Sequence, residues 1–251
     1  MSHMSLPGLV SIRIVTGMSV VSPVPPAPVT TVDEAIKRMQ EIESALPETD
    51  GVACFNRMYL DVTSKVNADL DNGFYQDRTF MTRLDVNFAN LYFDAVNQAG
   101  DLEAVPGAWR PLFERRAVPG IEEIQFALAG MNAHINHDLP IAMVDTCRDL
   151  ATAPDADPHH ADYEKVDRLL DAAEEAIRRS FEDKCERAAD QRLGAVANFV
   201  CNWGINCARD LAWTNAQLLW VVRQDRLARD LFLDSLTKAT ELAGRMLLVA
   251  V

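Results

Sequence analysis

The residues best suited to chemistry lie together in the middle of one apolar segment. Residues 121–145, IEEIQFALAGMNAHINHDLPIAMVD, have a helical period and carry His134, His137 and Asp138 at their centre. On an α-helix, residues three or four positions apart share a face, with side-chain origins about 5 to 6 Å apart. One helix is therefore expected to present two imidazoles and a carboxylate together, and we expect the rest of the chain to be organised around it.

The residues around this cluster are typical of a core helix, so its ionisable groups are expected to be at least partly desolvated. Such a placement costs free energy unless the groups pair, bind a metal or do chemistry. Pro140 has no N–H to donate to the carbonyl of Asn136, and we expect it to kink the helix beside the cluster. The apolar flanking residues are Ile121, Ile124, Leu128, Ile135, Leu139, Ile141 and Met143.

Three interpretations of the cluster stay open. As a metal site, His134 and Asp138 form a His-x3-Asp pair that can chelate one divalent ion such as zinc, with other helices supplying the remaining ligands. As a metal-free catalytic site, His134 or His137 oriented by Asp138 is a competent general base near neutral pH. As a structural network, the same side chains satisfy one another and the carbonyls released by Pro140. We favour a functional role over a purely structural one, and the sequence does not favour the metal site over the metal-free catalytic site.

A second group of polar residues follows helical spacing in an aromatic segment near the C-terminus. Asn206, Arg209 and Trp213 make up this group. Arg209 can clamp an acidic group of a substrate, and Trp213 can supply a flat apolar wall. In the competing interpretation Arg209 pairs with a core acid such as Asp85 or Asp138, and the tryptophan is a core residue. We favour the binding role for Arg209 and the core role for the tryptophan.

Asp85 is a further candidate acid or ligand. It lies on or beside the apolar face formed by Phe88, Ala89 and Tyr92, where a carboxylate is unusual. Its competing role is that of a partner to a buried arginine. The adjacent His159 and His160 fall in a polar, proline-containing segment, so we expect them to be exposed to solvent.

Composition restricts the class of ligand. The chain has 251 residues, of which 49% are hydrophobic, enough for a substantial core. Its net charge of −13 argues against nucleic acid or an anionic membrane surface as a partner, because both require clustered Lys and Arg. A small-molecule substrate is therefore expected, and the sequence leaves open whether chains associate into a homo-oligomer.

Five cysteines bear on the cellular compartment. Their number is odd, and none forms a Cys-x2-Cys pair. We expect reduced, buried thiols of a cytoplasmic protein, and neither a disulfide framework nor a zinc ribbon. The five are Cys54, Cys147, Cys185, Cys201 and Cys207.

The chain divides into a short N-terminal part and a long helical part. Residues 1–4, MSHM, are typical of a cloning-tag remnant. Residues 5–30 are expected to form an extended arm and a proline-rich connector, and their apolar run is too short and broken to span a bilayer. Residues 31–251 are expected to form a single all-α domain, a bundle of about seven or eight helices. The expected helical segments are residues 30–46, 52–70, 77–98, 109–116, 121–145, 163–190, 192–225 and 226 to about 244.

Four segments together resemble a bacterial family of uncharacterised helical proteins. They are GMNAHINHDLPIA at 130–142, ARDLAWTNAQLLW at 208–220, AGRMLL at 243–248 and LDVNFANLYFDA at 84–95. The resemblance covers most of the chain after the proline-rich connector. It implies a shared fold and a shared site, and it does not supply a reaction.

AHINHDLP also looks, more distantly, like a helix of zinc-dependent phospholipase C and single-strand nuclease proteins. That resemblance implies zinc ligation by His134 and Asp138 inside an all-helical domain. The N-terminal Trp ligand of those enzymes is missing here. A second His-x3-acid pair is present only if His160 and Glu164 serve.

Two hypotheses of function follow. In the first, the protein is a cytoplasmic enzyme acting on a small molecule by hydrolysis or cyclisation, as in specialised metabolism. Its acid–base groups or metal ligands would be His134, His137, Asp138 and Asp85, and Arg209 would help to complete the pocket. In the second, the protein is a non-catalytic helical binding or partner protein, and the same groups form a structural core network.

Overall fold

The computed structural model describes residues 26–170 and 204–250. These residues form helices and no strand, which confirms the all-α prediction. Three helical segments, residues 123–133, 134–138 and 139–149, follow one another without a break. When they are counted as one helix, this part of the chain contains eight helices. The arm predicted over residues 5–25, the helices predicted over residues 171–203, Cys185 and Cys201 lie outside the described residues.

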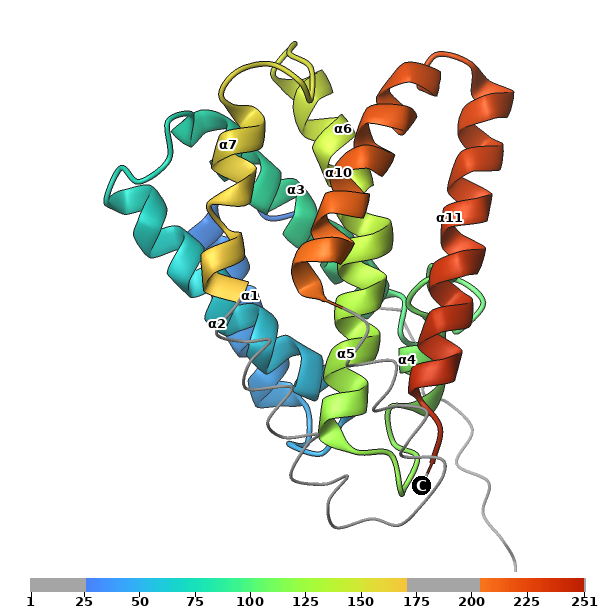
Figure 1. The fold of residues 1–251 in the computed structure, drawn as a ribbon. Coiled ribbons are helices and arrows are strands. Elements are labelled where there is room, and N and C mark those ends of the chain that lie inside the picture. Colours follow the sequence, from blue (N-terminus) through green and yellow to red (C-terminus); the bar gives the residue numbers. More distant parts are fainter. Residues whose placement is uncertain (1–25, 171–203, 251) are drawn as a thin grey trace, which may run out of the picture.

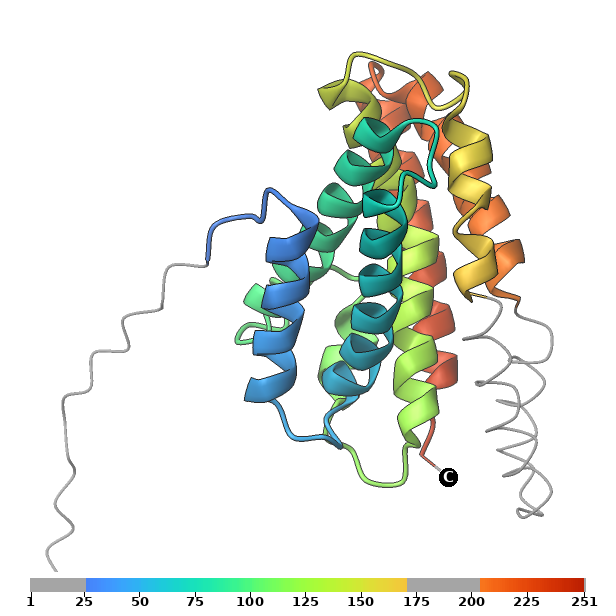
Figure 2. The same ribbon diagram turned by 90° about the vertical axis from the view of Figure 1, so that its left-hand side faces the viewer.

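One unbroken helix runs through the middle of the bundle (Figure 1). Helices α2 and α11 pack against its first part, and α3 and α10 pack against its last part. Helix α11 lies at the right-hand edge of the bundle in Figure 1, and helix α1 lies at the left-hand edge in Figure 2. The segments are α1 (Val32–Ala45), α2 (Gly51–Asp71), α3 (Arg78–Asn97), α4 (Arg110–Arg115), α5 (Glu123–Ala133), the π-helix η1 (His134–Asp138), α6 (Leu139–Asp149), α7 (His159–Glu164), α10 (Ile205–Val222) and α11 (Arg226–Leu247).

Side-chain caps fix where several helices begin. The Thr31 hydroxyl accepts from the backbone N–H of Glu34 at 3.2 Å, and the Glu34 carboxylate accepts from the backbone N–H of Thr31 at 3.3 Å. This reciprocal pair satisfies donors that the first turn of α1 leaves free. Asp50 caps α2 and Asp77 caps α3 in the simpler one-bond form.

The irregularity predicted beside Pro140 is a π-helical turn. The backbone N–H of Leu139 donates to the carbonyl of His134, five residues earlier, and Pro140 follows in the first turn of α6. In a regular α-helix the proline ring would clash with the carbonyl of Asn136. A π-helical turn contains about one residue more than an α-helical turn, and here this wider turn is the segment that carries the His/Asp cluster.

The structure corrects the expectation that residues 151–163 are an exposed loop. His159 begins helix α7 and is buried, with its ring stacked on Phe80 at 3.7 Å. Asp162 is also buried and accepts from the backbone N–H groups of Gln76 at 2.9 Å and Asp77 at 2.6 Å. The polar side chains of this segment therefore attach α7 to the start of α3.

Two helix boundaries also differ from the prediction. Gly204 has an extended backbone and precedes α10, so no single helix runs from residue 192 to residue 225. Helix α11 continues past Gly244 to Leu247. Gly244 packs against Pro111, where an added Cβ would lie 3.3 Å from the proline ring, so the glycine is a close-packing position and not a helix end.

The described cysteines divide into two groups. Cys54 and Cys147 are buried free thiols, as expected, and burial raises the pKa of Cys147 to about 12. Cys207 is exposed, so the expectation that all the thiols are buried is wrong. In the part of the chain that the structure describes, no helix is long and apolar enough to cross a membrane.

The contact between α2 and α5 depends on Gly130. An added Cβ there would lie 2.4 Å from the Phe55 ring, which packs edge-on against Trp109. We predict that Gly130→Ala lowers the free energy of unfolding by about 1 to 3 kcal/mol because the overlap must be relieved by movement of α2 or Phe55. Urea unfolding measures this. Gly100→Ala, where nothing lies within 4 Å, is the control, and equal stability of the two variants would contradict the close approach.

Candidate functional site

The carboxylate of Asp138 is the centre of the His/Asp cluster. It is 2% exposed, and its Oδ2 accepts from the indole Nε1 of Trp109 at 2.8 Å. Nδ1 of His134 lies 3.1 Å from the same oxygen, and Nδ1 of His137 lies 2.8 Å from Oδ1. Burial would raise the pKa of Asp138, but the hydrogen bonds from the two imidazoles outweigh it and hold the pKa below its usual value. Asp138 is therefore a buried, ionised acceptor with both oxygens in use.

His134 is held in one orientation. Its ring stacks on the Phe88 ring with centroids 3.4 Å apart, and the Tyr59 ring meets it edge-on at 4.4 Å. Burial lowers the pKa of His134, and the nearby Asp138 offsets this only in part. The imidazole is thus neutral near pH 7, with its proton on Nδ1 facing the carboxylate and a lone pair on Nε2. This Nε2 is buried and has no hydrogen-bond partner in the described part of the chain.

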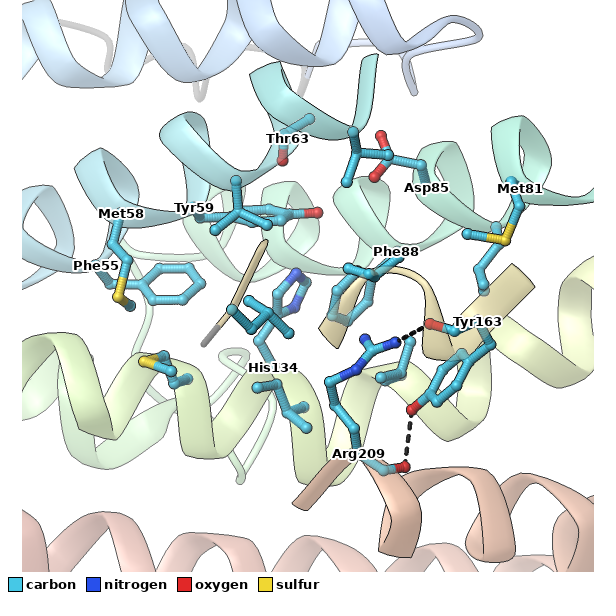
Figure 3. A pocket seen from close by; sticks show the side chains of 18 residues that line it. Phe55, Met58, Tyr59, Thr63, Met81, Asp85, Phe88, His134, Tyr163 and Arg209 are labelled. Atoms are coloured by element: carbon cyan, nitrogen blue, oxygen red, sulfur yellow. Dashed lines mark hydrogen bonds between the residues drawn. The ribbon is translucent and has the colours of Figure 1, made fainter. Parts of the chain in front are cut away.

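His134 lines a cavity of about 90 Å³ (Figure 3). The walls are mostly apolar and come from α2, α3, the central helix, the segment after α7, and α10. Two lining side chains have a buried polar atom without a hydrogen-bond partner among the described residues: His134, at Nε2, and Asp85, at Oδ2. Because a water molecule requires roughly 10 to 15 Å³, the cavity has room for several waters or a small organic molecule. Unused polar atoms in an apolar cavity are typical of a ligand site.

Asp85 faces this cavity from α3. Burial raises the pKa of its carboxyl from 3.8 to about 7, so protonated and ionised forms coexist near neutral pH. The Tyr59 hydroxyl points toward the side of the cavity where Asp85 and Thr63 lie (Figure 3). Burial and the charge of Asp85 raise the pKa of Tyr59, which keeps its hydroxyl protonated. The cavity therefore combines a free imidazole nitrogen with a carboxyl group that can give up a proton.

His137 does not share the cavity with His134, contrary to the face predicted from an α-helical period. Its Nε2 lies 3.0 Å from the hydroxyl of Thr237 on α11. The Thr237 hydroxyl also donates to the carbonyl of Leu233 at 2.8 Å. The wider π-helical turn directs the two imidazoles toward different neighbours. His137 therefore connects Asp138 to α11 and lies on the opposite side of the carboxylate from His134.

Arg209 lines the cavity but is already engaged. Its Nε donates a hydrogen bond to the Asp167 carboxylate, and one of its terminal NH₂ groups donates to the carbonyl of Tyr163 at 2.6 Å. The guanidinium also lies 4.0 Å above the centre of the Tyr163 ring. The competing interpretation, in which Arg209 pairs with an acid, describes its contacts, although the partner is Asp167 and neither Asp85 nor Asp138. The favoured role in binding a substrate stays a prediction. The bonds with Tyr163, drawn in Figure 3, attach α10 to α7, and the bond with Asp167 attaches it to the segment that follows α7.

The other predicted binding residues lie away from the cavity lining. Trp213 is buried against the rings of Tyr163 at 4.9 Å and His160 at 4.5 Å, as expected for a core residue. Asn206 lies in the first turn of α10 and is partly buried. His160 is half-exposed, 3.7 Å from Glu164, and it does not line the cavity either.

The donor set does not fit the metal interpretation of His134 and Asp138. Their facing atoms bond to each other, and Trp109 and His137 take two further acceptor positions of the carboxylate. A metal ion at this pair would have to displace those hydrogen bonds. Across residues 26–170 and 204–250, no three or more His, Cys, Asp or Glu side chains are grouped so that they could hold a metal ion.

A family model, described as a family of unknown function (DUF5995), matches residues 32–250. The chain belongs to this family. No curated protein and no solved structure matches the chain. The DUF5995 match agrees with the resemblance to an uncharacterised helical family, whereas nothing supports the likeness to zinc-dependent phospholipase C and nuclease proteins.

Several residues of the DUF5995 site were not identified from the sequence. Tyr59 and Thr63 are polar groups four residues apart in an apolar stripe of α2, and that spacing was the available signal. Trp109 begins the short expected helical segment 109–116, in which nothing in the local pattern indicates a bond from its indole to Asp138. Thr237 carries no local signal, because only the packing of α11 brings it to His137.

We predict that Asp138→Asn destabilises the protein by about 3 kcal/mol. Asparagine carries no negative charge, and its NH₂ group would face N–H groups that can only donate. Buried donors would therefore be left without an acceptor. Chemical denaturation measures the change. Asp145→Asn is the control, because Asp145 is half-exposed on α6 and pairs only with Arg148. A loss below about 0.5 kcal/mol for Asp138→Asn, the range of ordinary surface changes, would contradict the assigned role.

Asp85 predicts a pH-dependent stability. The pKa of the Asp85 carboxyl is about 7 in the folded chain, whereas its ordinary value is 3.8. Between pH 3.8 and pH 7 the folded chain therefore keeps a proton on Asp85 that the unfolded chain has released. Stability therefore falls as pH rises through this window. Asp85→Asn cannot ionise, so we expect it to match the wild type near pH 4 and to exceed its stability at pH 8 by about 4 kcal/mol.

Urea unfolding at both pH values tests this expectation. Asp61→Asn is the control, because the Asp61 carboxylate is exposed and pairs with Lys65 on the surface of α2. The same difference between wild type and Asp85→Asn at both pH values would show that Asp85 ionises normally.

Proposed function

We propose that the protein is an enzyme that carries out metal-free acid–base chemistry on a small, largely apolar molecule. The observation that carries this proposal is Nε2 of His134, a buried base with no hydrogen-bond partner among the described residues, in the wall of a cavity. Nδ1 of the same ring is held by an ionised carboxylate, which fixes the tautomer and stabilises the imidazolium that forms when Nε2 takes a proton.

The roles in the proposed reaction follow from the two titratable groups. Nε2 of His134 removes the proton of a substrate hydroxyl, and the oxygen then bonds to an electrophilic carbon of the same molecule. The electron pair displaced onto a carbonyl oxygen or alkene carbon takes a proton from the Asp85 carboxyl. The substrate is isomerised to a ring, His134 has gained one proton and Asp85 has lost one, and proton exchange resets the site.

The cavity supports cyclisation more than hydrolysis. Its apolar walls disfavour ordered water, and an intramolecular reaction requires no second reactant. A dry cavity of about 150 Å³ takes up benzene, so the present 90 Å³ fits a smaller molecule. Met58, Met81 and Met131 line the walls, and such flexible side chains can rearrange around a larger one. The substrate is therefore expected to be a small, neutral, hydroxyl-bearing compound.

A second candidate is a non-catalytic binding or partner protein. The observation that favours it is the completeness of the network around Asp138, in which Trp109, His137 and Thr237 are all bonded. A structural network of this kind explains every member except His134 Nε2 and Asp85. The enzyme proposal uses those two groups, which is why we rank it first.

Product formation by chelator-treated protein tests the proposal. The probes are short hydroxy-enones, which can cyclise by addition of the hydroxyl to the alkene, and simple esters without a hydroxyl group, which can only be hydrolysed; mass spectrometry in ¹⁸O-labelled water separates the two reactions. Cyclisation by isomerisation leaves the mass of the probe unchanged, whereas hydrolysis incorporates the label. We expect His134→Phe and Asp85→Asn each to lower the rate by about 10² to 10⁴.

The two variants protect the test against misfolding. His134→Phe keeps an aromatic ring against Phe88 but loses the bond to Asp138, whereas Asp85→Asn is expected to fold at least as well as the wild type. His160→Phe, outside the cavity, is the matched control and should retain full activity. Turnover that persists in both cavity variants, or that returns only when a divalent metal is added, would contradict the proposed mechanism.

A further inference from the structure

The outer surface of α10 and α11 carries an unusual share of exposed apolar side chains. Of the eleven large apolar side chains exposed in the described residues, seven lie on these two helices. Four of them follow the solvent-facing side of α11 and are more than half exposed: Leu227 (69%), Leu231 (59%), Leu242 (62%) and Met246 (60%). A group of exposed apolar side chains on one side of a helix is typical of an interaction site.

The spacing of these four side chains has a two-fold pattern. Leu227 and Met246 lie equally far in sequence from the midpoint between Leu236 and Thr237, and so do Leu231 and Leu242. If two copies of α11 pair antiparallel about that midpoint, Leu227 meets Met246 of the other copy and Leu231 meets Leu242. The stripe is therefore complementary to itself, as a two-fold interface requires.

The charges on α11 agree with this pairing. Helix α11 carries four basic and three acidic residues and is close to neutral, in a chain whose net charge is −13. Asp234 and Lys238 lie one turn apart on either side of the midpoint and bond at 2.6 Å within one copy. Antiparallel pairing brings Asp234 of each copy beside Lys238 of the other, so opposite charges meet at the centre.

We propose that α11 is the interface of an antiparallel, two-fold homodimer. The helix has 22 residues, which gives a shared length of about 33 Å. Its outer side forms the contact, and its inner side holds Thr237 against His137 of the site. Figure 1 shows α11 at the edge of the bundle, where a second copy can approach. Leu218 and Val221 of α10, both at least half exposed, extend the apolar surface near the turn between the two helices.

Cysteine crosslinking tests the register. In the proposed dimer, residue 231 of one copy faces residue 242 of the other, so the full-length double variant Leu231→Cys, Leu242→Cys is expected to form a covalent dimer on mild oxidation. Leu231→Cys alone and Leu242→Cys alone are the controls, because identical positions would lie about 16 Å apart along the helix, too far for a disulfide. They also report any crosslink through the exposed Cys207.

Sedimentation equilibrium tests the association itself. We expect the wild-type chain to dimerise at micromolar concentration, and Leu231→Asp with Leu242→Asp to weaken dimerisation at least 10-fold. Phe74→Asp is the control, since Phe74 is exposed in the turn between α2 and α3, far from α11. A monomeric wild-type chain would overturn the proposal. So would crosslinking of either variant with one introduced cysteine beyond the level seen in the wild type, or a monomer that binds neutral phosphatidylcholine vesicles through this surface.

Discussion

The structure depends on the placement of one negative charge in the core of the bundle. A buried carboxylate is tolerated only when hydrogen bonds replace its hydration, and Asp138 obtains them from separate parts of the chain. Trp109 approaches from the connection before α4, while His134 and His137 come from the same π-helical turn. Through His137 the charge also reaches Thr237 and thereby α11. The charge thus fixes the mutual position of the central helix, α4 and α11.

The same constraint makes His134 chemically available. Because Asp138 holds Nδ1, the opposite nitrogen keeps its lone pair and faces a mostly apolar cavity. Phe88 and Tyr59 prevent the ring from turning toward another partner. Burial in this mostly apolar cavity raises the pKa of Asp85 toward neutrality, because it penalises the charged form of the carboxyl group. Burial of the site is therefore the common reason why His134 keeps a free basic nitrogen and why Asp85 can be protonated near neutral pH.

Much of the fold and part of the site could be predicted from the sequence, for identifiable reasons. The helical period and the caps at Thr31 and other starts are local features, so the all-α class followed from them. The pairing of His134 with Asp138 needed only a four-residue spacing. The orientation of His137 could not be predicted, because an α-helical period does not anticipate a π-helical turn. Tyr59, Thr63 and Trp109 join the site through tertiary packing, which local patterns do not encode.

The tautomer of His134 tests the central claim most directly. Long-range ¹H–¹⁵N NMR of the histidine rings between pH 6 and pH 8, assigned with His134→Phe, reports which nitrogen carries the proton. The account predicts a ring that is neutral at pH 7 and above, protonated on Nδ1 and bare on Nε2, because burial lowers the pKa of His134 while Asp138 stays ionised. A proton on Nε2, or a doubly protonated ring across this range, would show that the nitrogen facing the cavity is not a free base.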